Sequence, residues 1–168
     1  MSQTGITDPA RETELDAWYI EHLRIMLTVP GIHSTQRFKT KNTGHPPSLA
    51  MYSVDSAAVF QDPYYLSVRG MGEWLPLIDR KHYRRNLFEG LAAAPAVSGD
   101  CVLLVADRPA AEGPADGVDF IWLKTVGLDR STPYRGIAVI RRDAAERFDT
   151  ADSRFAVYAP VTPYNRKD

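Results

Sequence analysis

The stretch LDAWYIEHLRIMLTVPGI, residues 15–32, decides the start of the fold, because it predicts a helix that turns directly into a strand. Its apolar side chains recur at three- and four-residue spacing, which is typical of one buried face of an amphipathic helix. Asp8 and Pro9 upstream are typical of a helix start, since a carboxylate caps free backbone N–H groups and proline fits the first turn. Pro30–Gly31 ends the helix.

Shorter segments after this helix have the pattern of β-strands. Strands are predicted over residues 32–40, 49–54, 82–91, 101–107, 134–142 and 154–161. Segment 82–91 is expected at the edge of a sheet, and glycine and proline indicate a broken helix over 64–77. Residues 118–126 are apolar and fit either type of element. Residues 1–8 are polar and predict a loop, so we expect no strand before the first helix.

The chain divides into two candidate halves. The segment Leu91–Gly99 is small, uncharged and proline-containing, and it predicts a joint between a first half, residues 1–95, and a second, β-rich half, residues 96–168. One compact domain is the alternative. A short internal similarity favours duplicated halves. It pairs Val29–Arg37 with Pro133–Arg141, and the tyrosine-containing strand Leu49–Val54 with Phe155–Pro160.

Length and composition exclude several classes of protein. The 168 residues carry 20 Lys and Arg against 21 Asp and Glu, and this near-neutral balance argues against a nucleic-acid partner. The single cysteine, Cys101, excludes an intrachain disulfide and a four-cysteine zinc site. The apolar runs are too short to span a bilayer, and residues 1–16 lack a signal-peptide pattern. We therefore expect a cytoplasmic protein with no membrane partner.

The pattern Trp18-Tyr19-x-x-His22, with Val29-Pro30-Gly31-Ile32 after it, resembles the EthD-like branch of the dimeric α/β-barrel superfamily. The resemblance covers roughly Leu15 to Leu91. It implies an α+β fold of ferredoxin-like units, each a four-stranded antiparallel sheet with two helices on one face. Two such units would join their sheets into an α/β barrel around a cavity.

One departure from that family concerns its first strand, which precedes the first helix. Because residues 1–8 are polar, the missing strand could be Cys101–Asp107, in a duplicated or permuted unit. The barrel could then close within one chain or across two copies, and the resemblance implies a homodimer.

The resemblance implies several activities, and fold alone does not choose among them. The hypothesis is a cofactor-independent lyase, isomerase or cyclase that acts by His-mediated proton transfer on a small carbonyl or aromatic, polyketide-like compound. No cofactor or metal is predicted, since Gly70-x-Gly72 lacks the third glycine of a dinucleotide fingerprint and the four histidines are scattered. The alternatives are a haem- or oxygen-dependent enzyme of the same superfamily, which a visible absorption spectrum would reveal, and a non-catalytic protein that binds a small ligand.

His22 and Tyr19 are the candidate catalytic residues, because both lie on the apolar face of the first helix. An imidazole can act as a base or an acid near neutral pH, and the resemblance implies that His22 lines the cavity. The hydroxyl of Tyr19 could hold a substrate oxygen on which negative charge develops. The alternative is a core histidine with one satisfied hydrogen bond, beside an aromatic residue packed on the sheet.

Further residues are candidates for binding the substrate. Arg37 could anchor an acidic group, and Tyr52 shares a strand face that could reach the same cavity. His82 begins a basic run that could bind a carboxylate or phosphate but that is more often a solvated face. The full set of candidate substrate-binding residues is Trp18, His33, Arg37, Tyr52, Tyr65, Trp74 and His82. For the aromatic members, filling a core is the alternative role.

Overall fold

The computed structural model describes residues 1–148 and 154–167. In these ranges the strands are β1 (Ser2–Thr4), β2 (Ile32–Lys39), β3 (Ser48–Val54), β4 (Arg84–Glu89), β5 (Cys101–Arg108), β6 (Ile121–Leu128), β7 (Tyr134–Arg141), β8 (Ala156–Pro160) and β9 (Asn165–Arg166). The α-helices are α1 (Glu12–Thr28), α2 (Pro63–Val68) and α3 (Arg142–Ala145). Short 3-10 helices are η1 (Pro9–Arg11), η2 (Ala57–Gln61), η3 (Gly72–Leu77) and η4 (Glu146–Phe148).

The strands form one closed antiparallel barrel. Around it the order is β3-β1-β4-β6-β7-β5-β8-β2, and β2 pairs in turn with β3, so eight strands close the sheet within one chain. β9 pairs with β2 beyond the end of β8. This α+β barrel answers the question left open by the sequence, because no second copy is needed to close it.

The two runs of four strands have the same order in the sheet. Within β1–β4 the neighbours are β4-β1-β3-β2, and within β5–β8 they are β8-β5-β7-β6. Counted from the start of each run, both orders are fourth, first, third, second. The pairs β4–β6 and β8–β2 join the runs into the barrel.

The expectation that no strand precedes the first helix is wrong. Ser2–Thr4 forms β1, which pairs with β3 on one side and β4 on the other. Its polar composition concealed it, but the polar side chains have partners: Gln3 is 5 % exposed, and its Oε1 accepts a hydrogen bond of 2.8 Å from Arg135. The strand Cys101–Asp107 therefore does not supply the missing strand, and no permutation is needed.

Two other expectations are corrected by the pairing. Segment 82–91 contains β4, which pairs with β1 and β6 and so is not an edge strand. The internal similarity aligned β2 with β7 and β3 with β8. β2 is the second strand of its run and β7 the third of its own, while β3 is a third strand and β8 a fourth. It therefore matches strands that are not equivalent, although the two runs do share one order.

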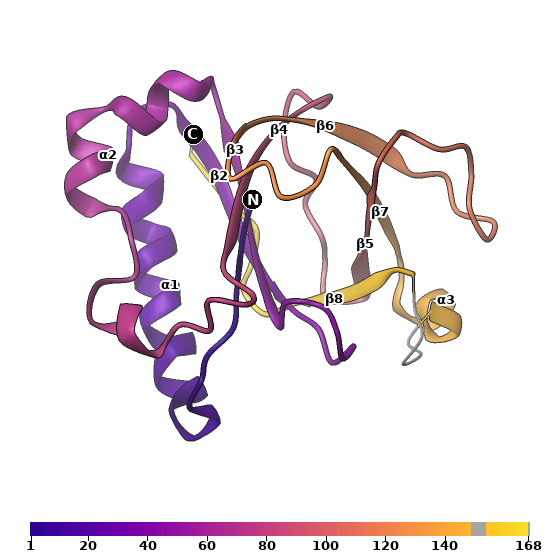
Figure 1. The fold of residues 1–168 in the computed structure, drawn as a ribbon, viewed down its shortest axis with the longest axis horizontal. Helices are drawn as coiled ribbons and strands as arrows, with labels where there is room; N and C mark the ends of the chain where they lie inside the picture. The colour runs from indigo at the N-terminus through magenta and orange to yellow at the C-terminus, as the bar shows by residue number, and fades with distance from the viewer. Residues whose placement is uncertain (149–153, 168) are drawn as a thin grey trace.

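α1 and α2 lie together on one side of the barrel, and the short α3 lies on the opposite side, beside β5 and β7 (Figure 1). Asp8 caps the short helix η1, since its carboxylate accepts from the Ala10 N–H at 3.1 Å, and α1 follows directly from η1. α1 packs on the outer face of β3, where its buried residues contact Ala50 and Trp74. The outer face of β5 and β7 is covered instead by an aromatic cluster that includes Phe148 and Phe155. A separate apolar core fills the barrel interior.

Gly136 makes room for this aromatic cluster. A Cβ atom at residue 136 would lie 2.9 Å from the Trp122 ring. We therefore expect Gly136→Ala to destabilise the fold by about 1–3 kcal/mol, since a well-packed ring must move. Urea denaturation measures this change, with Gly99→Ala as the control, because a Cβ there meets no atom within 4 Å. Equal effects of the two substitutions would contradict the packing at Gly136.

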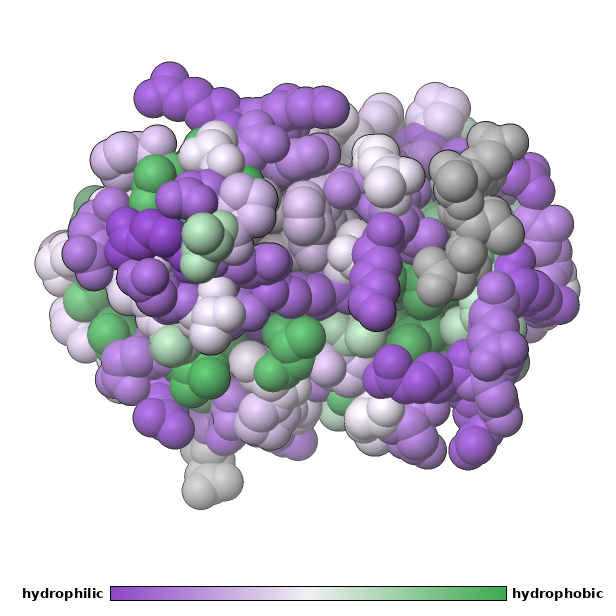
Figure 2. Space-filling view, turned by 90° about the horizontal axis from the view of Figure 1, so that it is seen from below, coloured by the Kyte–Doolittle hydropathy of each residue, from purple (hydrophilic) through white to green (hydrophobic). Residues whose placement is uncertain are grey.

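Polar side chains dominate the lower face of the molecule, where apolar residues form separate small patches (Figure 2). Among the described residues, the helices are all too short or too polar to cross a membrane.

Candidate active site

A pocket lies between α1, the α2 region and the sheet, and has a volume of about 160 Å³. It continues into the barrel, because neighbouring residues on both faces of β3 line it: Tyr52 and Val54 on the helix side, Met51 and Ser53 on the interior side. β1 pairs with β3 only as far as Ala50 and with β4 only as far as Arg85, so among the described pairings no strand bridges the ends of β3 and β4.

The segment between β4 and β5 closes one side of the pocket. Residues 91–94 line it, and the backbone N–H of Ala94 donates to Ser53 Oγ at 2.9 Å. Val97 is held by Gln36, which donates to its carbonyl at 2.7 Å and accepts from its N–H at 3.0 Å. The sequence predicted only a joint here. Its run of small residues was the one available signal that it packs closely against other elements.

His22 lines this pocket from α1. Its ring stacks on Trp18 with centroids 4.6 Å apart and planes 13° from parallel, and it meets Tyr19 edge-on at 5.8 Å. Burial lowers the pKa of His22 to about 4, so the ring is neutral at pH 7. Within the described parts of the chain, its nitrogens have no hydrogen-bond partner. The geometry therefore presents an uncharged imidazole, free to accept or donate a proton, to the pocket.

The lowered pKa of His22 predicts a specific loss of stability in acid. As pH falls from 6.5 towards 4, the unfolded chain binds a proton at residue 22 that the folded chain excludes. The free energy of unfolding should fall by roughly 3 kcal/mol more in the native protein than in His22→Gln across this window, and no further below it. Urea titrations at pH 7.5, 6, 5 and 4 measure this difference. Parallel curves for the two proteins would contradict a half-buried, neutral His22.

Three tyrosines that the sequence singled out also line the pocket: Tyr19, Tyr52 and Tyr65. Burial raises the pKa of the Tyr52 hydroxyl well above its usual range, and burial raises the pKa values of Tyr19 and Tyr65 as well. All three remain protonated donors at neutral pH. The hydroxyl of Tyr19 lies 3.9 Å from Met71 Sδ, which is a weak acceptor.

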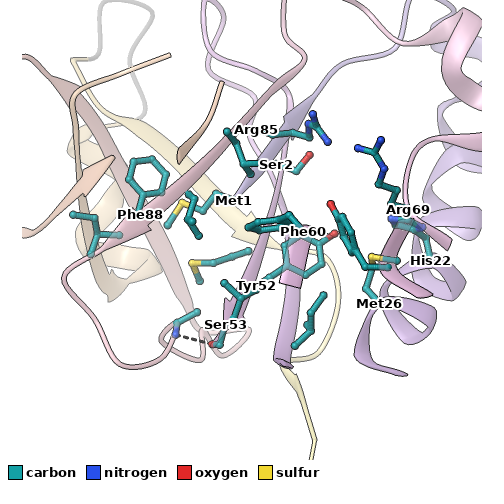
Figure 3. A pocket seen from close by; sticks show the side chains of 18 of the residues that line it. Met1, Ser2, His22, Met26, Tyr52, Ser53, Phe60, Arg69, Arg85 and Phe88 are labelled. Carbon is teal, nitrogen blue, oxygen red and sulfur yellow. Dashed lines mark hydrogen bonds between the residues drawn. The ribbon is translucent and has the colours of Figure 1, made fainter. Parts of the chain in front are cut away.

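Two arginines also line the pocket: Arg85, which belongs to the basic run beginning at His82, and Arg69, which the sequence did not single out. Arg69 follows α2 and Arg85 lies on β4, and Figure 3 shows their side chains approaching each other across the pocket, with Ser2 nearby. Nothing in the local sequence marks Arg69 or places it beside Arg85, because a loop and a distant strand meet only in the folded chain. His22 and Arg69 lie on the helix side in the same view, and Tyr52 lies on the sheet (Figure 3).

Arg37 does not line the pocket, although it was predicted to anchor an acidic group. Its guanidinium is 2 % exposed and already bound: it donates to Asp16 Oδ1 at 2.8 Å and to Ser48 Oγ at 3.0 Å. It also lies 4.2 Å from the centre of the Tyr19 ring. Arg37 therefore holds α1 against the sheet.

The other candidates lie outside the pocket lining. Trp18 stands behind His22, and Trp74 is buried in the core under α1, with the Arg11 guanidinium 4.6 Å from its ring centre. His33 is exposed and its Nε2 lies 2.6 Å from Asp55, while His82 Nε2 lies 3.8 Å from Asp79. The structure thus brings together His22, Tyr19, Tyr52 and Tyr65 and separates the remaining five.

The described residues contain no cluster of three or more histidine, cysteine, aspartate or glutamate side chains placed to hold a metal ion. Fold and site together define a class: a closed antiparallel α+β barrel with an aromatic pocket between its helices and sheet. Comparison with protein-family models finds no match, and searches of curated proteins and of solved structures also find none.

Proposed function

We propose that the chain is a cofactor-independent enzyme, a lyase, isomerase or cyclase, in which His22 transfers a proton to and from a small carbonyl compound. The observation that carries this proposal is the neutral, unpartnered imidazole of His22 on the wall of a ligand-sized pocket. Tyrosine hydroxyls that stay protonated line the same space, and they suit an oxygen that becomes negative.

The proposed step balances with these groups alone. A nitrogen of His22 takes a proton from the carbon beside the carbonyl, and the C–H electron pair moves to make an enolate. Tyr52 donates a hydrogen bond to the enolate oxygen. The imidazolium then returns the proton to the same carbon or to another one. A pKa near 4 makes a weak base in the empty pocket, but the negative charge that develops on the substrate favours the imidazolium.

Exchange of hydrogen for deuterium tests this step without knowledge of the natural substrate. The protein is incubated in D₂O at neutral pD with cyclohexanone and 4-oxocyclohexanecarboxylate, and NMR follows the protons beside the carbonyl. We expect exchange at least about tenfold faster than in buffer, since general bases contribute larger factors than this. If the compounds bind but their protons exchange no faster than in buffer, only the non-catalytic function of binding a small ligand would remain.

We also propose that the two runs of four strands are two ferredoxin-like units of an EthD-like barrel fused in one chain. The shared order of strands and the placement of α1 between β1 and β2 support this. A homodimer and a cytoplasmic location stay predictions. Sedimentation of the purified protein tests the first, and closure of the barrel does not depend on its outcome.

A further inference from the structure

We propose that Arg69 and Arg85 form an anion clamp at this pocket, and that the ligand is a carboxylic acid with a single ring. This inference deepens the proposed function and rests on it only in taking the pocket as the ligand site. It concerns recognition and not the proton transfer, so the two can fail separately.

The charge of the pocket favours an anion. Arg69 and Arg85 line it, and no aspartate or glutamate does among the described residues. Both cations lie close to the Tyr65 hydroxyl. Burial raises the pKa of this hydroxyl, and the positive charges of Arg85 and Arg69 each oppose that rise. A carboxylate placed there would meet two guanidinium groups, which bind carboxylates through paired hydrogen bonds.

Arg85 is only partly satisfied within the protein. Its Nε is buried and has no hydrogen-bond partner in the described chain. Its closest acid is Asp129, whose Oδ2 accepts from the Arg85 backbone N–H at 2.8 Å while Oδ1 lies 3.9 Å from the guanidinium. Buried polar atoms are normally hydrogen-bonded. A ligand oxygen near Arg85 would satisfy this side chain.

Arg69 is likewise available. It is exposed, and among the described residues it interacts with the Tyr65 hydroxyl but forms no ion pair with an acidic group. The two buried arginines differ in this respect, because Arg37 is bound to Asp16 and Arg135 is bound to Asp107. Among the described residues, neither cation at the pocket has a carboxylate within hydrogen-bonding distance of its guanidinium, since the nearest to Arg85 lies 3.9 Å away.

The size and walls of the pocket limit the rest of the ligand. Its volume of about 160 Å³ resembles a cavity of about 150 Å³ that accepts benzene in another protein. Apolar groups such as Met26, Phe60 and Leu87 line it. One six-membered ring therefore fits, with its carboxylate towards the arginines.

Calorimetric titration with benzoate and with its neutral isostere benzamide, at 0.15 M salt, tests the clamp. We expect benzoate to bind at least about tenfold more tightly than benzamide, as charge-assisted hydrogen bonds predict. Arg69→Gln and Arg85→Gln should each lower benzoate affinity about tenfold or more and leave benzamide unchanged. Arg84→Gln is the matched control, because Arg84 neighbours Arg85 on β4 but bonds to the carbonyls of Arg80 and Tyr83.

Three outcomes would overturn the clamp: no benzoate binding at 10 mM, equal affinities for benzoate and benzamide, or an equal loss in Arg84→Gln and Arg85→Gln. The catalytic proposal is distinguished by deuterium exchange. Arginine-dependent benzoate binding together with no exchange on any ring ketone would uphold the clamp and end the proton-transfer proposal. Exchange on cyclohexanone that neither arginine substitution affects, together with equal affinities for benzoate and benzamide, would uphold the proton-transfer proposal and end the clamp.

Discussion

The substitution His22→Gln is expected to lower enzyme-dependent deuterium exchange at least about 100-fold, because a positioned general base contributes this much or more. Glutamine is close in size and can form hydrogen bonds, but it cannot take up the proton. Binding of benzoate should stay within about threefold of the native value, since the arginines carry it in our account. The readouts are NMR exchange rates and calorimetric affinities on the same preparations.

His33→Gln is the matched control for this experiment. His33 is an exposed histidine whose ring nitrogen contacts Asp55, outside the pocket lining. Its substitution should leave the exchange rate unchanged. If both variants exchange as fast as the native protein, then His22 is not the base. If circular dichroism shows that His22→Gln unfolds, then Trp18→Leu tests the site instead, because it removes the aromatic ring stacked on His22.

A second large effect is expected inside the barrel, where Asp107→Ala should reduce the free energy of unfolding by about 3 kcal/mol. Arg135 is fully buried, and Asp107 accepts two hydrogen bonds from it, at 2.7 and 2.8 Å. Removal of the carboxylate leaves a buried guanidinium with Gln3 as its main remaining hydrogen-bond partner. Loss of one partner from a buried pair costs about 3–5 kcal/mol, and the 44 % exposure of Asp107 places this case at the lower end.

Two variants make this result specific. Glu21→Ala removes an exposed ion pair to Arg24 on α1 and should change stability by less than about 0.5 kcal/mol. The double variant Asp107→Ala with Arg135→Met should be more stable than Asp107→Ala alone, since it removes the unpaired buried charge. A loss below 0.5 kcal/mol in Asp107→Ala would show that Arg135 does not depend on this carboxylate.

The sequence predicted α1 well, because its signals are local. The apolar period and the Pro30–Gly31 stop lie in or directly after α1, and Asp8 caps η1, which leads straight into α1. Closure of the barrel was not predictable in this way, since β2 pairs with β8 across more than 100 residues. β1 escaped detection because its residues are polar, and the partner of its buried Gln3 is Arg135, far along the chain.

In the candidate site, too, local signals were predicted and long-range contacts were not. Helical spacing placed Tyr19 and His22 together, and both reach the pocket. Arg37 lies on the same side of the sheet as Tyr52, since it is opposite Ala50 in the ladder, but Asp16 of α1 binds its charge. Only the packing of α1 on the sheet reveals that ion pair. The same packing brings Arg69 and Arg85 to one pocket from positions that no motif connects.

The most direct test of the central claim is an NMR titration of the His22 ring with benzoate at pH 6, with the signals assigned by comparison with His22→Gln. The account predicts a neutral imidazole before addition, because its pKa is about 4, and a saturable shift of its signals as benzoate fills the pocket. Ring signals of His22 that stay unchanged at 10 mM benzoate would contradict a ligand site beside this residue.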